Sequence, residues 1–297
     1  MVVDTILFGD CRETLKEFDG KARTCVTSPP YYGLRDYGGE ESQIGQEQTP
    51  EEYIQNLVEV FRSVRDVLTD DGTLWVNIGD SYYNYRPGKG QALPKQTVSK
   101  TKQDLPDKCA KRGNKLEGLK EKDLIGIPWM LAFALRADGW YLRQDIIWHK
   151  PNPMPESVKD RCTKSHEYIF LLSKNRKYYY NNEAIKEPVK QDWGTRDRTK
   201  GKYHNPGTGL VPHSGLSKSY DRKNKRDVWT VTNKPYKGAH FAVYPPDLIE
   251  PCIKAGSEEG DIVLDPFMGS GTTALVSKSL NRHYIGCELH EDYGRLI

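Results

Sequence analysis

The sequence contains no long apolar run: nowhere do about 18 consecutive apolar residues occur, the length that a helix needs to cross a bilayer. Its amino terminus, MVVDTILFGD, has no basic region ahead of a short apolar stretch, so it lacks the form of a secretory signal. The six cysteines include no C-x-x-C pair and no histidine at the spacing of zinc ligands. We therefore expect a soluble, cytoplasmic protein with free thiols, no metal centre and no membrane partner.

Net charge is small, but it is unevenly spread along the chain. The 297 residues carry a formal net charge of +3. Residues 81–122 contain 11 Lys or Arg against 4 Asp or Glu, and residues 186–237 contain 13 against 5, which leaves −12 for the remainder. An acidic scaffold with two basic segments suits a polyanionic partner, although charge runs are also common on solvated loops. The length suits one large domain with an inserted module.

Apolar periodicity predicts strands that alternate with helices. The capping box Thr49-Pro50-Glu51-Glu52 opens an amphipathic helix, and the polar residues 70–72 are expected to stop it. The predicted strands are 2–8, 22–27, 73–78, 141–148, 167–173, 177–180, 262–264 and 283–287, and the predicted helices are 12–18, 50–68, 124–137, 246–255 and 272–280. This alternation predicts an α/β fold with a parallel sheet and crossover connections.

Three segments fall outside this pattern. Residues 82–118 and 186–226 show no apolar periodicity and are rich in charge, so we expect a long basic loop and a basic insertion. Residues 291–297 begin a helical pattern and stop within its second turn. We therefore expect the natural chain to continue beyond this point.

The tetrapeptide Ser28-Pro29-Pro30-Tyr31 follows the predicted strand 22–27. Two consecutive prolines fix the backbone and lack amide donors, so the carbonyl groups there can accept hydrogen bonds from another molecule. A rigid turn with a hydroxyl, a carbonyl and an aromatic ring can cradle a planar group that bears an NH2. The same four residues could also do no more than end a strand, so taken alone they leave both interpretations open.

Residues 263–274 read as a strand, a glycine-rich turn and the start of a helix. Gly269 and Gly271 allow a ligand to approach the backbone at a helix amino terminus. The pattern Gly269-x-Gly271-x-x-Ala274 also fits the loose dinucleotide fingerprint of nicotinamide dehydrogenases, whereas the lack of a lysine after Gly271 argues against a phosphate-binding P-loop. Glu288 ends the next predicted strand, where a carboxylate can accept both ribose hydroxyls of a nucleoside cofactor.

Several motifs in one order resemble those of the amino-methylating DNA methyltransferases, which use S-adenosylmethionine (SAM) to methylate N4 of cytosine or N6 of adenine. Asp265-Pro266-Phe267-x-Gly269-x-Gly271-Thr272-Thr273 is similar to the SAM loop of that family, and residues 28–31 are similar to its catalytic tetrapeptide. The resemblance covers nearly the whole chain. It implies that Asp10 faces the SAM adenine, that the segment 240–245 packs near the methionine end, and that the segment 148–153 walls the target-base pocket. The cofactor contacts expected from this resemblance and from the residues themselves are Asp10, Asp265, Phe267, Gly269, Gly271, Thr272, Glu288, His240 and Phe241.

The catalytic motif precedes the SAM loop, whereas the commoner order places the cofactor loop first. This order is similar to the beta group of the family, in which a target-recognition region lies between the two halves. The resemblance implies a circularly permuted, Rossmann-like SAM-dependent methyltransferase fold, with a mixed, mostly parallel sheet and an inserted target-recognition region. The expected division is a catalytic half at 1–181 with its basic loop at 82–118, a target-recognition region at 182–227 and a SAM-binding half at 228–297.

The activity that the resemblance implies is site-specific methylation of double-stranded DNA at N4 of a flipped cytosine. The Ser28 hydroxyl and the Pro29 carbonyl would each accept an N–H bond and aim the nitrogen lone pair, while Tyr31 stacks on the base. A first-position serine is associated with N4-cytosine in this family and aspartate with adenine, so N6-adenine is the alternative. Methylation at carbon 5 needs a cysteine nucleophile, and the only Pro-Cys pair, Pro251-Cys252, lies in a predicted helix and is not followed by glutamine.

Other functional classes stay open on the sequence: a non-catalytic DNA-binding module and an RNA or protein-amide methylator. His149 and His166 have no paired ligand and are expected to be structural. A cognate restriction endonuclease is a candidate partner in a bacterial, archaeal or phage-infected cell, and the chain is expected to be a monomer or homodimer. The expected DNA contacts are Arg196, Arg198, Arg222, Lys223, Lys225, Arg226 and Lys150.

Overall fold

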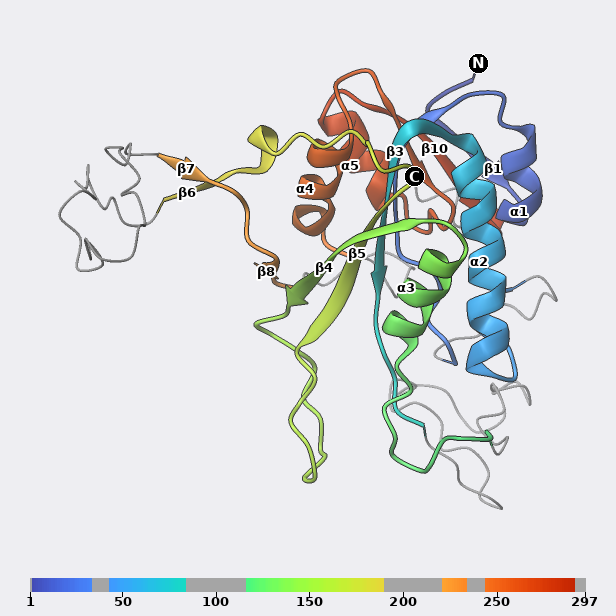
Figure 1. The fold of residues 1–297 in the computed structure, drawn as a ribbon, viewed down its shortest axis with the longest axis vertical. Coiled ribbons are helices and arrows are strands. Elements are labelled where there is room, and N and C mark those ends of the chain that lie inside the picture. The colour runs from blue at the N-terminus through green and yellow to red at the C-terminus, as the bar shows by residue number, and fades with distance from the viewer. Residues whose placement is uncertain (1, 34–42, 84–115, 190–220, 234–243, 292–297) are drawn as a thin grey trace, which may run out of the picture. The chain divides into compact units, whose positions relative to one another are not determined.

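The computed structural model describes residues 2–33, 43–83, 116–189, 221–233 and 244–291 (Figure 1). The chain divides into two compact units, the first formed by Met1–Tyr180 with Asp227–Ile297 and the second by Asn181–Arg226. Within the described part of the chain, no helix is long and apolar enough to cross a membrane. Most of the expected basic loop, and the expected helix at 291–297 apart from its first residue, lie outside the described residues.

The first unit is built on an eight-stranded sheet with the strand order β1-β10-β9-β2-β3-β5-β4-β8. Antiparallel pairs join β3 to β5 and β5 to β4, and all other neighbours are parallel. The predicted mixed, mostly parallel sheet is thereby confirmed. The strands are β1 (Thr5–Phe8), β2 (Ala22–Thr27), β3 (Leu68–Ile78), β4 (Tyr141–His149), β5 (His166–Ser173), β8 (Val228–Thr230), β9 (Ile262–Asp265) and β10 (His283–Glu288).

Helices cover both faces of this sheet (Figure 1). One face carries α1 (Cys11–Thr14), α2 (Pro50–Val67) and α3 (Ile127–Ala137), and the other carries α4 (Pro246–Gly256) and α5 (Thr272–Ser279). The predicted capping box opens α2: the Thr49 hydroxyl accepts from the Glu52 amide at 3.2 Å, and the Glu52 carboxylate accepts from the Thr49 amide at 3.3 Å. Apolar side chains at helical spacing, including the fully buried Tyr53 and Phe61, then turn one side of α2 into the core.

Strands from opposite ends of the chain are neighbours in the sheet. Near the amino terminus, β1 pairs with β10 and β2 pairs with β9, both in parallel. The segment that ends in the Ser-Pro-Pro-Tyr turn therefore lies beside the segment that ends in the glycine-rich loop. The sheet brings together the two halves that the permuted motif order predicts.

The helix α2 ends at Val67, before the expected stop at Asp70-Asp71-Gly72, but the next strand begins earlier than the predicted residue 73. The strand begins at Leu68, directly after α2, and the buried Leu68 pairs with Ala22 before the register of β2 against β3 shifts. Residues 69–72 form an irregularity in β3 where the chain bends back, because a Cβ at Gly72 would lie 3.0 Å from the Leu68 Cβ atom. Glycine is needed at position 72, since a Cβ there would lie 2.9 Å from a carbonyl oxygen of the same strand.

Two further differences concern short strands. Residues 177–180 were predicted to form a strand, and they do not. Instead the Tyr180 ring stacks on Trp75, with the ring centroids 6.3 Å apart. The strand β8 was not predicted, and it pairs in parallel with β4 at the edge of the sheet. β8 was missed because its three residues are too few to show the alternation of apolar and polar side chains that identifies a strand.

The second unit is described only at its two ends. There β6 (Glu187–Pro188) pairs antiparallel with β7 (Arg222–Lys223), and a short 3₁₀ turn precedes them at Glu183–Ile185. The Glu187 carboxylate binds Lys223 at 3.4 Å and Arg226 at 2.6 Å. The segment that was expected to have no regular structure is thus closed at its base by a small ladder and by ion pairs.

Candidate active site

Five neighbouring strands, β1, β10, β9, β2 and β3, run parallel, so their carboxyl ends meet at one edge of the sheet. The segments that follow these strands line a cavity of about 680 Å³. This volume lies within the range of about 300–1,000 Å³ that is usual for small-molecule sites. The lining residues that the sequence predicted are Asp10, Ser28, Pro29, Pro30, Tyr31, Lys150, Phe267, Gly269, Thr272 and Glu288.

The glycine-rich loop and the end of β10 line this cavity together, the loop with its backbone and β10 with the buried carboxylate of Glu288. Gly269 and Gly271 have φ of +55° and +80°, and Gly271 is the N-cap of α5. The Glu288 carboxylate accepts from the amides of Gly269 at 2.8 Å and His290 at 3.1 Å, and burial raises its pKa despite these two donors. Gly286 lies beneath Met268, because a Cβ at that position would be 2.4 Å from the Met268 Cε atom. The loop is therefore held close against β10.

Asp265 lies behind the loop and is not among the residues that line the cavity. Its side chain is 1% exposed and accepts four hydrogen bonds, from the Thr27 hydroxyl at 2.6 Å, the Phe267 amide at 3.0 Å, the Thr273 hydroxyl at 2.6 Å and the Tyr244 hydroxyl at 3.0 Å. Burial raises the pKa of Asp265, and these hydrogen bonds oppose that rise. Asp265 therefore links two segments through hydrogen bonds: Thr273 at the start of α5, and Thr27, which immediately precedes the Ser-Pro-Pro-Tyr turn.

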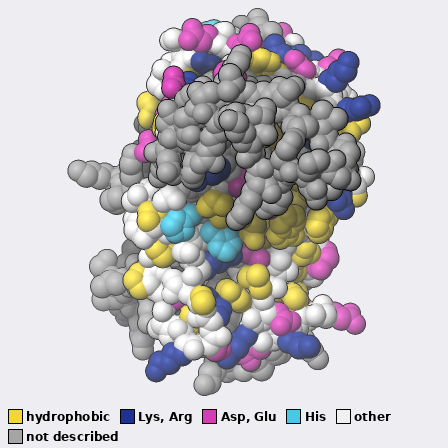
Figure 2. Space-filling model, turned by 60° about the vertical axis from the view of Figure 1, so that its left-hand side comes forward, with side chains coloured by type: hydrophobic (Ala, Val, Ile, Leu, Met, Phe, Trp, Pro, Cys, Tyr) yellow, Lys and Arg dark blue, Asp and Glu magenta, His cyan; other side chains and the backbone are white. Residues whose placement is uncertain are grey.

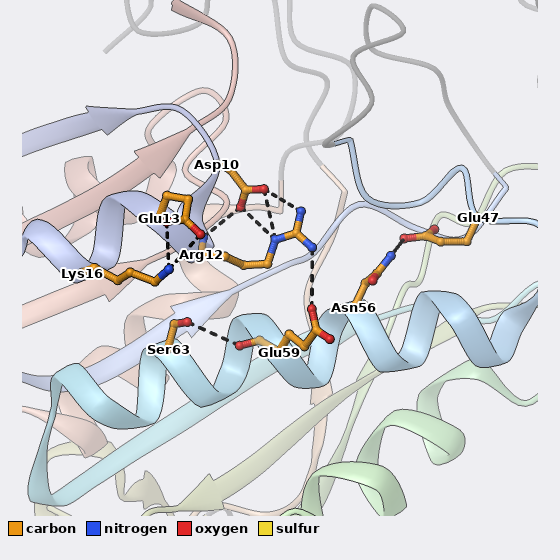
Figure 3. A network of polar contacts seen from close by, with 8 residues as sticks. All are labelled: Asp10, Arg12, Glu13, Lys16, Glu47, Asn56, Glu59 and Ser63. Carbon is orange, nitrogen blue, oxygen red and sulfur yellow. Dashed lines mark hydrogen bonds and ion pairs between the residues drawn. The ribbon is translucent and has the colours of Figure 1, made fainter.

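Asp10 lines the cavity while holding the start of α1, of which it is the N-cap (Figure 3). Its carboxylate accepts from the Arg12 amide at 2.9 Å and from the Arg12 guanidinium at 2.5–3.0 Å. Burial alone would raise the pKa of Asp10, but the hydrogen bonds and charge of Arg12 outweigh it, and the pKa lies below its ordinary value. Arg12 also reaches Glu59 of α2 at 3.8 Å.

The carbonyl groups of the Ser-Pro-Pro-Tyr turn differ in their partners. The Pro30 carbonyl accepts from the hydroxyl of Tyr53, a fully buried residue of α2, at 2.7 Å. No residue in the described part of the chain donates a hydrogen bond to the Pro29 carbonyl. The turn is therefore fixed through Pro30, while Ser28 and Pro29 line the cavity and carry a hydroxyl and a carbonyl that can accept hydrogen bonds.

Tyr31 is fixed by a carboxylate that the sequence did not point to. Its hydroxyl donates to Glu167 at 2.7 Å, and Asn77 donates to the same carboxylate at 3.3 Å. The Tyr31 ring packs on Gly79, where a Cβ would lie 2.7 Å from a ring carbon. Burial, together with the charge of Glu167, raises the pKa of Tyr31 well above its ordinary value, so the hydroxyl stays a donor. A charged residue at the start of an otherwise apolar strand was the signal that could have identified Glu167.

Lys150 forms an ion pair with Glu167 in the wall of the cavity. Its ammonium also lies 4.1 Å from the centre of the Trp148 ring. Both side chains of the pair are 16% exposed, so this lysine lies in the pocket and not on a basic surface. Trp148 and Pro153 line the same cavity, as the resemblance implies for the segment 148–153.

The other predicted site residues lie elsewhere. Arg222, Lys223 and Arg226 lie in the second unit, where a guanidinium nitrogen of Arg222 donates to the Lys186 carbonyl at 2.6 Å and the other two bind Glu187. Lys225 lies beside them. Arg196, Arg198, His240 and Phe241 lie outside the described residues. Among the described residues no group of three or more His, Cys, Asp or Glu is arranged to hold a metal ion.

Comparison with known proteins places the chain in a family. The model of a DNA methylase family, N6_N4_Mtase, matches residues 22–297. The chain belongs to this DNA methylase family. It is 48% identical over 297 residues to the Type II methyltransferase M.SmaI of Serratia marcescens, covering 98% of this chain and 88% of that protein. It is also 47% identical to the Type II methyltransferase M.XycI of Xanthomonas campestris pv. cyanopsidis, covering 97% and 84%.

Solved structures of DNA methylases share the fold. The PvuII DNA methyltransferase, described as cytosine-N4-specific, has a TM-score of 0.61 at 17% identity, covering 99% of this chain and 84% of that one. The complex of M1.HpyAVI with SAM has a TM-score of 0.52 at 19% identity, covering 98% and 96%. The chain is a SAM-dependent DNA methyltransferase of the amino-methylating N4/N6 family. The glycine-rich backbone and the buried Glu288 carboxylate in the cavity fit a nucleoside cofactor.

Proposed function

We propose that this DNA methylase transfers a methyl group to the exocyclic N4 of cytosine in double-stranded DNA. One observation carries the proposal: Ser28 and Pro29, which bring a hydroxyl and a carbonyl, line the same cavity as the glycine-rich loop and Glu288. A pair of acceptors opposite a nucleoside site is what an amino group needs in order to approach a methyl donor.

The residues of this chain would act chiefly by positioning. When bound, SAM supplies a methyl group that is activated by the positive charge on sulfur. The Ser28 hydroxyl and the Pro29 carbonyl each accept one N–H bond from the base, which holds the nitrogen pyramidal and aims its lone pair. The Tyr31 ring, fixed by Glu167, serves as the stacking surface for a base that has left the duplex.

The cysteines support direct displacement and not a covalent intermediate. Cys252 is buried in α4, and burial raises the pKa of Cys287, which lines the cavity, to about 12. A thiol in this state stays protonated at neutral pH, and a protonated thiol is a poor nucleophile.

For the cofactor, we propose that Glu288 accepts the ribose hydroxyls and that Phe267, Gly269 and Thr272 line the rest of its site. Asp10 would lie at the adenine end. Asp265 and Gly271 would support the loop without lining the cavity, Asp265 through its hydrogen bonds and Gly271 by supplying the backbone turn into α5. His240 and Phe241 are proposed for the methionine end on the resemblance alone.

The choice of cytosine rests on Ser28. A neutral hydroxyl at this position is the form that the N4-cytosine enzymes of the family favour, although it can accept an N–H bond from either amino group. The solved neighbour that is described as cytosine-N4-specific is similar in fold only. Serine therefore carries the proposal, and adenine N6 is the outcome that the experiment below would have to exclude.

We propose that residues 182–227 form the target-recognition region. Arg196, Arg198, Arg222, Lys223, Lys225 and Arg226 would contact phosphates there, with Lys150 acting inside the base pocket instead. The curated relatives are named Type II methyltransferases, which supports a cytoplasmic role in protecting DNA against a cognate restriction endonuclease, with the enzyme acting as a monomer or homodimer.

The product of the reaction tests the proposal. Duplex DNA is incubated with the enzyme and methyl-labelled SAM, digested to nucleosides and separated by mass. We expect the label in N4-methyl-deoxycytidine. Label in N6-methyl-deoxyadenosine would replace the proposed base, and label taken up by competing RNA in preference to duplex DNA would replace the proposed substrate.

A further inference from the structure

One apolar side chain lines the active-site cavity and yet is open to solvent. Met154 is 71% exposed and belongs to the loop at 150–165 that joins β4 to β5 and extends away from the sheet (Figure 1). On the face shown in Figure 2, hydrophobic side chains gather beside histidine side chains in the middle of the described surface. Met154 therefore lies where the cavity meets the solvent, so a molecule that enters the cavity from outside can contact it.

The residues on either side of Met154 are held in place. Before it, Asn152 and Asn233 exchange two hydrogen bonds, at 3.1 Å and 3.0 Å. After it, the Glu156 carboxylate accepts from the Arg161 guanidinium at 2.5 Å and from the Lys164 amide at 3.4 Å. The side before Met154 is therefore tied to the segment that follows β8, and the side after it is tied within the loop itself.

The backbone beside Met154 is also restricted. It is flanked by Pro153 and Pro155, which fix their own φ angles and limit the residues before them. Arg161 adds a further support, because its guanidinium lies 3.9 Å from the centre of the Tyr82 ring. The loop thus holds the backbone of Met154 on a stiff base, while the unbranched apolar side chain stays open to solvent and can adapt its shape.

We propose that Met154 is a wedge that enters the DNA stack where the target base has left it. Methionine and proline are among the side chains that proteins insert between base steps, and methionine adapts its shape to an irregular gap. Because Met154 lines the cavity that would receive the base, the same loop can fill the gap while the base occupies the pocket. This inference rests on the proposed flipping of the base, and it adds the residue that stabilises the flipped state.

The test compares duplexes in which the target base is paired or mispaired. Flipping is costly when the base is paired and cheap when it is mismatched. For M154A we expect kcat/KM to fall by about tenfold on the paired duplex, which corresponds to about 1.4 kcal/mol of lost stabilisation. On a duplex with the target mismatched, the variant should stay within about twofold of the wild type, because the wedge has less to do.

Val158 offers a matched control, since it is also exposed and lies in the same loop but does not line the cavity. We expect V158A to match the wild type on both duplexes and M154L to retain most of the activity. Because Met154 is exposed, M154A should unfold at the temperature of the wild type.

Three outcomes would overturn the wedge: an M154A enzyme unchanged on the paired duplex, an equal loss on paired and mismatched duplexes, or an equal loss in V158A. The quantity compared is the loss in kcat/KM on the paired duplex relative to the loss on the mismatched duplex, and the target base is whichever base the wild type methylates. If the wild type methylates adenine, the proposed base is contradicted. The wedge is still tested, because M154A and the wild type are then compared on duplexes in which that adenine is paired or mispaired.

Discussion

At the scale of residues, the hydrogen bonds of Pro30 and Tyr31 decide which atoms the Ser-Pro-Pro-Tyr turn can offer to a substrate. The hydroxyl of Tyr53 in α2 donates to the Pro30 carbonyl, and the carboxylate of Glu167 in β5 accepts from the Tyr31 hydroxyl. Ser28 and Pro29 line the cavity, and their hydroxyl and carbonyl are the acceptors that the proposed chemistry needs. The reactive geometry is thus set from outside the motif, by two side chains that need not touch the substrate.

Removing the Tyr53 hydroxyl tests this positioning. We expect Y53F to lose about 1 kcal/mol of stability, because the Pro30 carbonyl loses its donor. Its kcat should fall several-fold with little change in SAM affinity, since the turn is free to shift while the cofactor loop is untouched. Stopped-flow transfer rates and SAM titrations measure the two effects separately.

Y32F is the matched control for that variant. The Tyr32 ring lies 5.5 Å from that of Tyr53, but its hydroxyl donates to the Gln48 carbonyl and not to the turn. A kcat that falls equally in Y32F and Y53F would show that the hydrogen bond to Pro30 has no particular part in positioning.

At the scale of elements, Asp10 and Arg12 join the start of α1 to the cavity and to α2 (Figure 3). The pKa of Asp10 is lowered from its ordinary value of 3.8, because the hydrogen bonds and charge of Arg12 outweigh the effect of burial. The ionised form is therefore favoured in the folded protein. The stability that it contributes is fully present above the unfolded pKa and is lost as the pH falls through the lower folded pKa.

We expect R12Q to be less stable than the wild type by about 0.5–1 kcal/mol at neutral pH, a small value because the pair is partly exposed. The difference should stay constant above the ordinary pKa of Asp10 and shrink as the pH falls below it. Urea unfolding across this pH range measures it. K16Q is the control, since Lys16 follows α1 and forms an exposed ion pair with Glu13 of that helix at 2.8 Å. A deficit of R12Q that persists unchanged in acid would contradict the assigned role of the ion pair.

The elements also show what the sequence could predict. The amphipathic helix after Thr49 was predicted because burial on one side gives a regular apolar period, whereas the strand at 22–27 is buried almost throughout and was predicted as a short run that ends at the Ser-Pro-Pro-Tyr turn. The early start of β3 at Leu68 was not predicted, because the pairing of Leu68 with Ala22 depends on a strand that is distant in sequence. Glu167 and Tyr53 escaped notice for a related reason: their hydrogen bonds join residues that are distant in sequence.

At the scale of the whole molecule, charge is divided between an acidic remainder and two basic segments. The described end of the second basic segment carries Arg222, Lys223, Lys225 and Arg226 in the second unit. Its ion pairs with Glu187 offset part of this charge and fix where the basic side chains are presented.

Replacing Lys223 and Lys225 together by glutamine should weaken DNA binding and reduce its dependence on salt. If both contact phosphates, the slope of log affinity against log salt should fall in magnitude by up to about two. Fluorescence anisotropy over a series of salt concentrations gives the slope. A double K16Q/K254Q variant, with the same change of charge in the acidic remainder, should keep the wild-type slope. An unchanged slope in the Lys223 and Lys225 variant would remove these residues from the DNA contact.

The modified bases in DNA from cells that express the enzyme test the central claim most directly, when they are identified by sequencing that distinguishes N4-methylcytosine from other marks. The account predicts N4-methylcytosine confined to one short recognition sequence, and none in cells that express a folded S28A variant. N6-methyladenine in its place, or N4-methylcytosine made equally well by S28A, would contradict it.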